Sequence, residues 1–448
     1  MFEDISMKKS ILSFIIILGV FCSLFSVSSS AYSPSSFTVN AEYCMLSNMD
    51  TGEVIYSKNA DQRLYPASVT KLMTALVVCE NVDDLNKTVV IDGDLLDLLL
   101  GTDSSLSYIV KDEVLTIDQL LHYLLITSGN DTALVLAKYV GGTVDRFVEM
   151  MNETAAKLGM NSTHFMNPHG LPDDDHYTTV LDIHKLATAA FGVEKIKTIC
   201  GYSRYVMPPT NLHGERTLST TNFLINKTTN YYYKYCTGGK TGYTESAGRC
   251  IVSTAEKEGM RYLSIVMKAD PKYTDANGIQ KRIEFIDTAK LFEWAFNNFS
   301  YKTVIDKNEY LGDIDVGLSW EDSNIQLFAK DSLTALLPNE ADKSSIEVDL
   351  KFIDGKKVDA PIDKGQVIAV ASVFYANEKI GEIELCSSKN VKRSMLQYLW
   401  MLFTGSFDTI WFKLIFVVLG VTLLTYWIIS IIQINSINRR RRRVRRHR

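Results

Sequence analysis

The segment 66–78 constrains the fold of this chain more than any other, because it places two reactive side chains on one helical turn. Pro66 favours the first turn of a helix, and the apolar residues from Leu72 onward contain no helix breaker. Ser68 and Lys71 are three residues apart and therefore share a face. A lysine desolvated against an apolar helix loses its proton more readily and can activate a serine hydroxyl. The same spacing also occurs where a helix begins beside an ordinary solvated lysine.

Two later tripeptides complete a pattern that the first motif alone does not establish. Ser-Gly-Asn at 128–130 follows the apolar run 120–126, where we expect a helix to end in a polar turn. Lys-Thr-Gly at 240–242 precedes the β-prone run 250–254. Three short motifs in this order, at spacings typical of a domain, argue against coincidence. They add a second serine, an amide and a second lysine to the candidate site.

Ser-x-x-Lys, Ser-x-Asn and Lys-Thr-Gly in this order are the signature of penicillin-binding proteins and class A β-lactamases. Within this group the chain resembles the D-alanyl-D-alanine carboxypeptidases, which are low-molecular-mass penicillin-binding proteins. The resemblance extends to Asn-Pro-His-Gly-Leu-Pro at 167–172, to His-Tyr-Thr-Thr at 176–179 and to Ala-Pro-Ile-Asp-Lys-Gly at 360–365. It covers residues 38 to 390, which is most of the chain.

The order of the expected elements agrees with the fold that this resemblance implies. Residues 41–46 and 53–56 alternate as two strands joined by an Asp-Thr-Gly turn, residues 115–193 are mainly helical in period, and strands return from 236. Helices between early and late strands predict a sheet covered by helices, the α/β (α+β) transpeptidase/β-lactamase-like peptidase fold of the family. Residues 301–392 show short alternating segments between Gly, Asp and Asn turns, which predict a small all-β sandwich.

The resemblance implies a serine-peptidase role for each motif. Ser68 would attack the carbonyl of the penultimate D-alanine of a peptidoglycan stem peptide ending in D-Ala-D-Ala, Lys71 would remove the hydroxyl proton, and Ser128 would relay a proton to the leaving D-alanine. β-Lactam antibiotics would acylate Ser68 in the same way. No cofactor is implied, and the Cys and His spacings predict no metal site. The substrate-binding residues that the resemblance implies are Asn130, Lys240, Thr241, Gly242, Tyr243 and His169.

One role of the family is left open by the sequence. The family usually supplies an arginine, after the Lys-Thr-Gly strand, that helps to hold the terminal carboxylate of the substrate. Here Glu284 stands near that place, with Lys281 and Arg282 just before it. Either cation would substitute, so the sequence does not assign this ligand.

The N-terminus has the pattern of an export signal. Two lysines at 8–9 precede the mostly apolar residues 11–25, and small residues surround an expected cleavage after Ala31. A first transmembrane helix fits less well, because the apolar run is short and interrupted by serines. Export would permit disulfides among the six cysteines beyond this point, for example between Cys236 and Cys250, and buried free thiols are the alternative.

The C-terminus predicts a membrane anchor. Residues 414–432 carry no charge and are long enough to cross a bilayer. The eight arginines between 439 and 448 mark the cytoplasmic side. A helix lying in the plane of the membrane is the alternative, but this run is apolar on every side. Removing these eight from the 47 Lys and Arg leaves 39 basic against 52 acidic side chains, so the folded body is acidic and nucleic-acid binding is not expected.

These observations divide the chain into six segments and place the catalytic domain outside the cell membrane, with a single transmembrane pass. The expected segments are a signal peptide (1–31), a serine D-Ala-D-Ala peptidase domain (32–300), a small β-sandwich domain (301–392), a juxtamembrane segment (393–413), a transmembrane helix (414–434) and a basic cytoplasmic tail (435–448).

Two other functions would use the same motifs. A class A β-lactamase adds a glutamate-containing loop that drives deacylation, whereas the corresponding residues 167–172 contain no glutamate. A non-catalytic penicillin sensor or wall-binding module would not need the intact serines, lysines and asparagine of the three motifs. The β domain and the anchor also favour a wall-facing peptidase over a β-lactamase.

Overall fold

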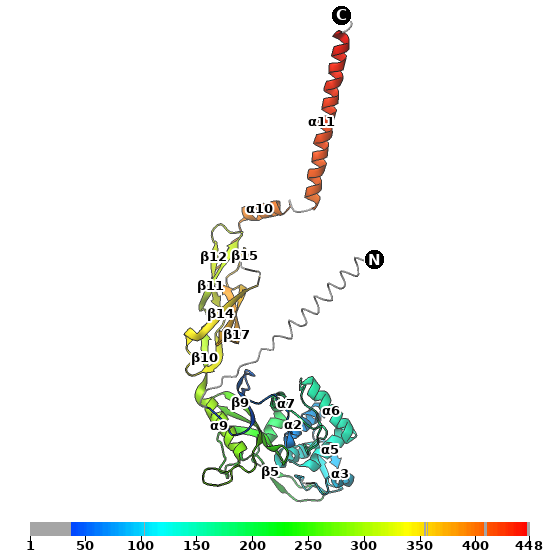
Figure 1. Ribbon diagram of the computed structural model, residues 1–448, viewed down its shortest axis with the longest axis vertical. Coiled ribbons are helices and arrows are strands. Elements are labelled where there is room, and N and C mark those ends of the chain that lie inside the picture. The colour runs from blue at the N-terminus through cyan, green and yellow to red at the C-terminus, as the bar shows by residue number, and fades with distance from the viewer. Residues whose placement is uncertain (1–36, 103, 354, 356, 407–409, 446–448) are drawn as a thin grey trace. The chain divides into compact units, whose positions relative to one another are not determined.

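A computed structural model describes residues 37–102, 104–353, 355, 357–406 and 410–445 of the chain. The expected signal peptide, 1–31, lies outside the described residues. The chain forms two compact units, residues 1–300 and 301–448 (Figure 1).

The first unit is built on a five-stranded sheet with helices packed against it. The expected hairpin around the Asp-Thr-Gly turn forms and pairs with a late strand, so that Tyr43 lies opposite Met267. The strand that carries Lys-Thr-Gly is at the edge of the sheet, where its outer backbone groups are free to pair with a peptide. The strand order is β2 (Val54–Lys58), β1 (Tyr43–Asn48), β9 (Met260–Ala269), β8 (Gly248–Lys257) and β7 (Cys236–Thr244).

The helix that follows Ser68 forms the centre of this unit. This helix, α2 (Thr70–Asn81), has nine consecutive buried side chains, from Thr70 to Val78, so all of its faces are covered in this stretch. The unit also contains α3 (Gly93–Asp97), α4 (Ile117–His122), α5 (Asn130–Gly141), α6 (Val144–Lys157), α7 (Val180–Gly192), α8 (Glu194–Cys200), α9 (Ile283–Asn298), the paired strands β3 (Thr88–Val90) and β4 (Val114–Thr116), and the hairpin β5 (Arg204–Met207) and β6 (Arg216–Ser219).

The second unit is a β-sandwich followed by two helices. Alternating side chains such as Leu327 and Ala369 fill its core. Its strands form a pair, β10 (Phe299–Ile305) with β13 (Leu333–Pro338), and a six-stranded sheet in the order β14 (Ile346–Phe352), β16 (Val367–Tyr375), β17 (Glu378–Ser387), β12 (Asn324–Ala329), β11 (Tyr310–Gly317) and β15 (Lys357–Asp359). The helices are α10 (Met395–Ser406) and α11 (Ile410–Arg445). Among the described residues, only the part Ile410–Ile437 of α11 is long and apolar enough to cross a membrane.

The six cysteines of the described chain are free thiols. The sheet register sets Cys236 opposite Ala255 and Cys250 opposite Gly242, so the two cysteines that flank the hairpin are not cross-strand neighbours. Burial raises the pKa of Cys250 to about 12, as expected of an inert thiol in the core. Of the two alternatives that the sequence left open, the structure has the free thiols, of which Cys44, Cys200 and Cys250 are buried and the other three are partly exposed.

Candidate active site

The candidate nucleophile lies on a strained turn rather than in the α-helix proper. Ser68 is in a 3₁₀ turn, η1 (Ala67–Val69), so the helix expected from Ser68 begins two residues later. Ala67 has a φ of 48°, in the left-handed region that alanine avoids. The loop at Gly170 packs directly on this turn, because a Cβ at Gly170 would lie 1.9 Å from the carbonyl oxygen of Ala67. Strain of this kind at a reactive serine is typical of a functional site.

Lys71 is fully buried and holds its amine against the serine. Its Nζ lies 2.9 Å from Ser68 Oγ, as the three-residue spacing predicted. The same nitrogen is 2.6 Å from Asn130 Oδ1 and 2.8 Å from the carbonyl oxygen of His169. His169 therefore contacts the lysine through its backbone, while its buried ring accepts a hydrogen bond from Leu171 N–H.

Electrostatics favour the neutral form of this lysine. Burial, and secondly the nearby ammonium of Lys240, hold the pKa of Lys71 well below its ordinary value, while the Asp131 carboxylate opposes them. Burial lowers the pKa of Lys240 as well, to about 7. Two buried lysines thus share one site, and the charge of Lys240 makes protonation of Lys71 more costly.

The second motif presents its serine from an irregular turn. Ser128 follows the π-helical turn η2 (Tyr123–Thr127) and has a φ of 66°. This turn interrupts the helical period that the sequence predicted for the region, and it aims Ser128 at the third motif. Lys240 Nζ donates to Ser128 Oγ at 2.8 Å and to the carbonyl oxygen of Thr241 at 2.6 Å.

A loop before the second motif fixes the asparagine. Asn130 donates from its backbone N–H to the carbonyl oxygen of Ser105 at 2.7 Å, and from Nδ2 to Ser104 Oγ at 3.1 Å. The next residue, Asp131, is buried and accepts from Ser107 N–H at 2.8 Å. These bonds orient the amide so that its oxygen faces Lys71 and not solvent.

The edge strand β7 borders the serine closely. Thr241 Oγ1 lies 2.5 Å from Thr221 Oγ1, and Tyr243 is exposed beyond it. A Cβ at Gly242 would lie only 2.9 Å from the backbone nitrogen of Ser68. Glycine at this position therefore lets the strand approach Ser68 closely.

These residues surround a pocket of about 950 Å³. Seven of the nine predicted site residues line it. The other two, Lys71 and Lys240, are buried next to it and form hydrogen bonds to the lining residues Ser68 and Ser128. Several lining residues were missed in the sequence, because no motif marks them and only the folded loops bring them together. They include Ser104, Ser105, Thr220, Thr221, Phe223 and Glu245.

Arg282 and Lys281, the two cations that the sequence left as alternatives, have different surroundings in the structure. Arg282 lines the pocket, with its guanidinium 5.1 Å from the ring centre of Phe223. Lys281 instead pairs with Asp275 at 3.4 Å. Glu284, which stands where the family has its arginine, is buried and receives a hydrogen bond of 2.5 Å from Arg282 Nε.

Comparison with known proteins identifies the family. Residues 29–271, more than half of the chain, match the model described as D-alanyl-D-alanine carboxypeptidase. The chain belongs to the D-alanyl-D-alanine carboxypeptidase family. It is therefore a serine hydrolase with that activity, as the three motifs predicted, and the rival β-lactamase and sensor functions are not supported. Residues 299–393 match the C-terminal domain of penicillin-binding protein 5.

Similar proteins cover most of the chain. D-alanyl-D-alanine carboxypeptidase DacF of Bacillus subtilis is 27% identical over 362 residues, which are 80% of this chain and 88% of the relative. The DacD protein of Escherichia coli is 29% identical, over 79% of this chain and 84% of the relative. The crystal structure of penicillin binding protein 5 from Haemophilus influenzae superposes with a TM-score of 0.60 at 24% identity, covering 81% of this chain and all of that chain, and confirms the fold.

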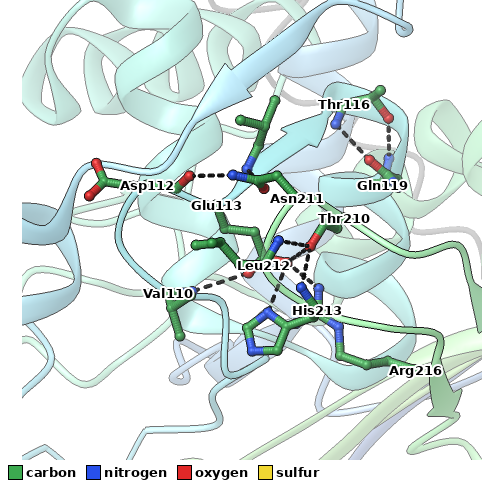
Figure 2. A network of polar contacts seen from close by, with 11 residues as sticks. Val110, Asp112, Glu113, Thr116, Gln119, Thr210, Asn211, Leu212, His213 and Arg216 are labelled. Atoms are coloured by element: carbon green, nitrogen blue, oxygen red, sulfur yellow. Dashed lines mark hydrogen bonds and ion pairs between the residues drawn. The ribbon is translucent and has the colours of Figure 1, made fainter.

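A polar network of this carboxypeptidase centres on the buried carboxylate of Glu113 (Figure 2). Glu113 is fully buried and accepts from Thr210 Oγ1 at 2.9 Å, from Val110 N–H at 3.2 Å and from the Arg216 guanidinium. His213 Nδ1 lies 3.3 Å from the same carboxylate. Burial opposes ionisation most strongly, yet the hydrogen bonds from Thr210 and Val110, together with Arg216, hold the pKa of Glu113 below its usual value.

The network connects the β5–β6 hairpin to the turn that carries Ser128. The Arg216 guanidinium lies 5.1 Å from the ring centre of Tyr123, the first residue of η2. Asn211, between β5 and β6, joins this hairpin to β4 instead, since its side chain donates to the carbonyl oxygen of Asp112 and accepts from Val114 N–H (Figure 2). No sequence motif marks this network, because its members are separated by about a hundred residues.

Proposed function

We propose that this carboxypeptidase uses Ser68 as its nucleophile and Lys71 as its general base. The observation that carries the proposal is the position of the Lys71 amine. Its two hydrogen-bond acceptors, Asn130 Oδ1 and His169 O, take two N–H groups, so the lone pair of the neutral amine faces Ser68 Oγ at 2.9 Å. The lowered pKa of Lys71 makes that neutral form accessible.

The side chains of the two serine–lysine pairs can carry the proton transfers of the reaction. Ser68 Oγ attacks the carbonyl carbon of the penultimate D-alanine, and its proton passes to Lys71. Ser128, held by Lys240, donates its hydroxyl proton to the leaving nitrogen as the C–N bond breaks and D-alanine departs, and Ser128 is reprotonated by Lys71. Lys71 then removes a proton from the water that attacks the acyl-enzyme, and it returns this proton to Ser68 Oγ as the acyl group leaves as a carboxylic acid. The backbone N–H groups of Ser68 and Tyr243 would stabilise the oxyanion, for which the close approach at Gly242 is the support.

The substrate is the stem peptide of peptidoglycan ending in D-Ala-D-Ala, and β-lactams react as its analogues. Thr241 and Lys240 would receive the terminal carboxylate at the edge of β7. Arg282 would complete this ligand set, because it lines the pocket and its charge is only partly neutralised by Glu284 on one side. Asn130 Nδ2 and the bare strand at Gly242 would hold the peptide backbone.

The test of the nucleophile is chemical. Penicillin-treated protein should carry one adduct on Ser68 in peptide mapping, and Ser68→Ala should abolish both the adduct and D-alanine release. Ser246→Ala is the matched control, since Ser246 lines the same pocket without a role in the proposal. An adduct on another residue, or labelling of Ser68→Ala, would overturn the assignment.

The proposal also covers the position of the protein relative to the cell membrane. Helix α11 would anchor the enzyme in the cell membrane through Ile410–Ile437, with the arginine tail in the cytoplasm and both compact units outside, where peptidoglycan lies. The segments 32–300, 301–392, 393–413, 414–434 and 435–448 would be the peptidase domain, the β-sandwich, the juxtamembrane segment, the anchor and the tail. Protease added to intact cells should digest both units and leave the tail protected. Digestion of the tail from outside would contradict this topology.

A further inference from the structure

Glu284 is a buried acid whose side chain has a single hydrogen-bond partner. It is 1% exposed, lies in the first turn of α9, and accepts from Arg282 Nε at 2.5 Å through its Oε1. Among the described residues, no other group donates a hydrogen bond to this carboxylate. A buried carboxylate in one ion pair adds little net stability, because the cost of desolvation offsets the attraction. Stability alone therefore does not account for the pair.

Aromatic rings hold the guanidinium of Arg282 from another side. It lies 5.1 Å from the ring centre of Phe223 and 4.8 Å from that of Phe285, and these two rings stack at 5.2 Å. The backbone N–H of Arg282 donates to Tyr231 Oη at 3.0 Å, and the Tyr231 ring packs on Phe285. Cation–π contacts favour one placement of a guanidinium over the rings. Glu284 and the rings together thus restrict the direction of the Arg282 head group.

The restricted guanidinium keeps its outer end for the pocket. Its Nε is used by Glu284, whereas no residue in the described part of the chain accepts a hydrogen bond from Nη1 or Nη2. Arg282 and Phe223 line the pocket, and η3 (Phe223–Ile225) packs against β7, the strand that carries Thr241. Two N–H donors side by side on a planar guanidinium match the two oxygens of a carboxylate.

A second arginine makes this cluster positive. Arg249, on β8, lies opposite Tyr243 in the sheet register, and its guanidinium is 4.9 Å from the centre of that ring. Burial, and secondly the charge of Arg282, lower the pKa of Arg249, so the two guanidinium groups act on each other. Two arginines and one glutamate leave a net positive charge beside the pocket, which attracts an anionic group.

We infer that Glu284 is a positioning residue, which holds Arg282 so that Nη1 and Nη2 face the terminal carboxylate of the substrate. The inference rests on the proposed role of Arg282 as a ligand of that carboxylate, and it adds the residue that orients this ligand. Glu284 itself does not line the pocket. Its contribution is preorganisation, because an arginine already fixed by an ion pair loses less side-chain entropy when a carboxylate binds. If Glu284 instead competed with the substrate for Arg282, its removal would have the opposite effect.

The experiment measures recognition of the carboxylate separately from the rest of the reaction. The full-length enzyme in detergent is given two thioesters, N-benzoyl-D-alanyl-thioglycolate and its methyl ester, which differ only in the carboxylate of the leaving group. The readout is the ratio of their kcat/KM values. We expect Arg282→Gln to lower this ratio about 10- to 100-fold, the usual effect of losing a hydrogen bond to a charged group. Glu284→Ala should lower it about 3- to 10-fold, the usual effect of having to immobilise one long side chain.

A double variant tests whether the two residues act as a unit. Arg282→Gln/Glu284→Ala should show the same ratio as Arg282→Gln alone, because Glu284 acts only through Arg282. Glu293→Ala is the matched control and should keep the wild-type ratio, since Glu293 lies on the same helix and accepts from Tyr233 Oη away from the lining of the pocket.

Arg282→Lys answers the same question if Glu284→Ala does not fold. Lysine keeps the positive charge but has no planar fork that Glu284 could orient. The ratio should therefore fall in this variant as well. The wild-type ratio in Arg282→Lys would show that a charge at this position suffices, and it would overturn the positioning role.

The remaining outcomes separate Glu284 from Arg282. A lowered ratio in Arg282→Gln with a wild-type or raised ratio in Glu284→Ala would overturn the positioning role and leave Arg282 as the ligand. Equal losses on both thioesters in Glu284→Ala would likewise overturn it, because they would assign Glu284 to the stability of the fold. An unchanged ratio in Arg282→Gln would overturn the proposed carboxylate ligand, and the inference about Glu284 with it.

Discussion

Lys240 and Ser128 are 112 residues apart in the chain, yet Lys240 Nζ donates to Ser128 Oγ at 2.8 Å. The pocket thus contains two serine–lysine pairs, because Ser68 and Lys71 form the other. Ser68 and Lys71 are neighbours in the sequence, whereas the fold brings Ser128 and Lys240 together. The two pairs are coupled electrostatically, since the charge of Lys240 lowers the pKa of Lys71.

Lys71→Arg tests the base. Arginine keeps a positive charge but cannot supply a neutral amine at ordinary pH. We expect acylation by penicillin to fall by roughly 10²–10⁴-fold, the usual contribution of a positioned general base. The measurement is the second-order rate of adduct formation. Lys138→Arg, at an exposed ion pair with Asp92, is the control and should react at the wild-type rate. A near-normal rate in Lys71→Arg would mean that another group removes the proton.

Lys240→Gln tests the coupling between the two lysines. Acylation requires neutral Lys71, so its rate rises as the pH passes upward through the pKa of Lys71. Removing the ammonium of Lys240 removes an influence that lowers this pKa, and the acid limb of the profile should therefore move to higher pH. Lys268→Gln, on β9 of the same sheet, is the control for general loss of charge. An unmoved acid limb in Lys240→Gln would show that the two amines are not coupled.

Gly242→Ala tests the approach of β7 to the nucleophile. The added Cβ would lie 2.9 Å from Ser68 N, so either the strand or the serine turn must shift. We expect a loss of about 10²-fold in acylation, similar to the removal of one oxyanion donor, with the thermal midpoint nearly unchanged. Gly214→Ala is the control, because no atom lies within 4 Å of its Cβ position. Full activity in Gly242→Ala would remove the support for an oxyanion hole here.

Glu113→Gln tests the polar network around Glu113. The change leaves the Arg216 guanidinium without its carboxylate, and an unsatisfied charged group in a mostly buried site costs about 1–3 kcal/mol of stability. Because Arg216 also packs on Tyr123, acylation should fall along with the thermal midpoint. Arg146→Gln, which breaks an exposed pair with Glu153, should change neither quantity. A stable but slow Glu113→Gln variant would point to positioning of Ser128 rather than to stability alone.

The sequence predicted the parts of the site that are set by spacing along one element. Ser68 and Lys71 share a turn at any helix start, so their contact followed from a three-residue interval. The sheet, the helices and the β-sandwich also followed from periodicity and from the family resemblance. The expected α-helical start at Ser68 differed only because the loop at Gly170 holds Ala67 in a left-handed conformation.

The features of the site that depend on segments far apart in the chain could not be predicted from local sequence spacing. Arg282 enters the pocket while Lys281, its neighbour, turns to Asp275, and nothing in the local sequence distinguishes two adjacent cations. The backbone role of His169 was likewise hidden, because a carbonyl oxygen carries no residue-specific signal. Short strands such as β15 were missed since three residues are too few to show alternation.

His176→Gln tests a pH dependence at the start of α2, the helix that carries Lys71. Met166 N–H donates to His176 Nδ1 at 3.1 Å, so Nε2 carries the ring proton and donates to Thr70 Oγ1 at 2.9 Å. Burial lowers the pKa of His176 to about 4, against about 6.5 in the unfolded chain. Between these values the unfolded state binds more protons, so stability rises with pH and is lost on acidification. The loss should reach about 3 kcal/mol at pH 4 for this group alone.

The measurement is the thermal midpoint of the first unit between pH 4 and pH 7.5. Glutamine does not titrate, so the midpoint of His176→Gln should fall less steeply on acidification than that of the wild type. Thr70→Val is the matched control, because it removes the partner of Nε2 and keeps the imidazole. That variant should be less stable at every pH and should keep at least the wild-type steepness. Equal steepness in the wild type and in His176→Gln would show that the ring has the same pKa in the folded and the unfolded chain, and would assign the acid sensitivity of the first unit to other groups.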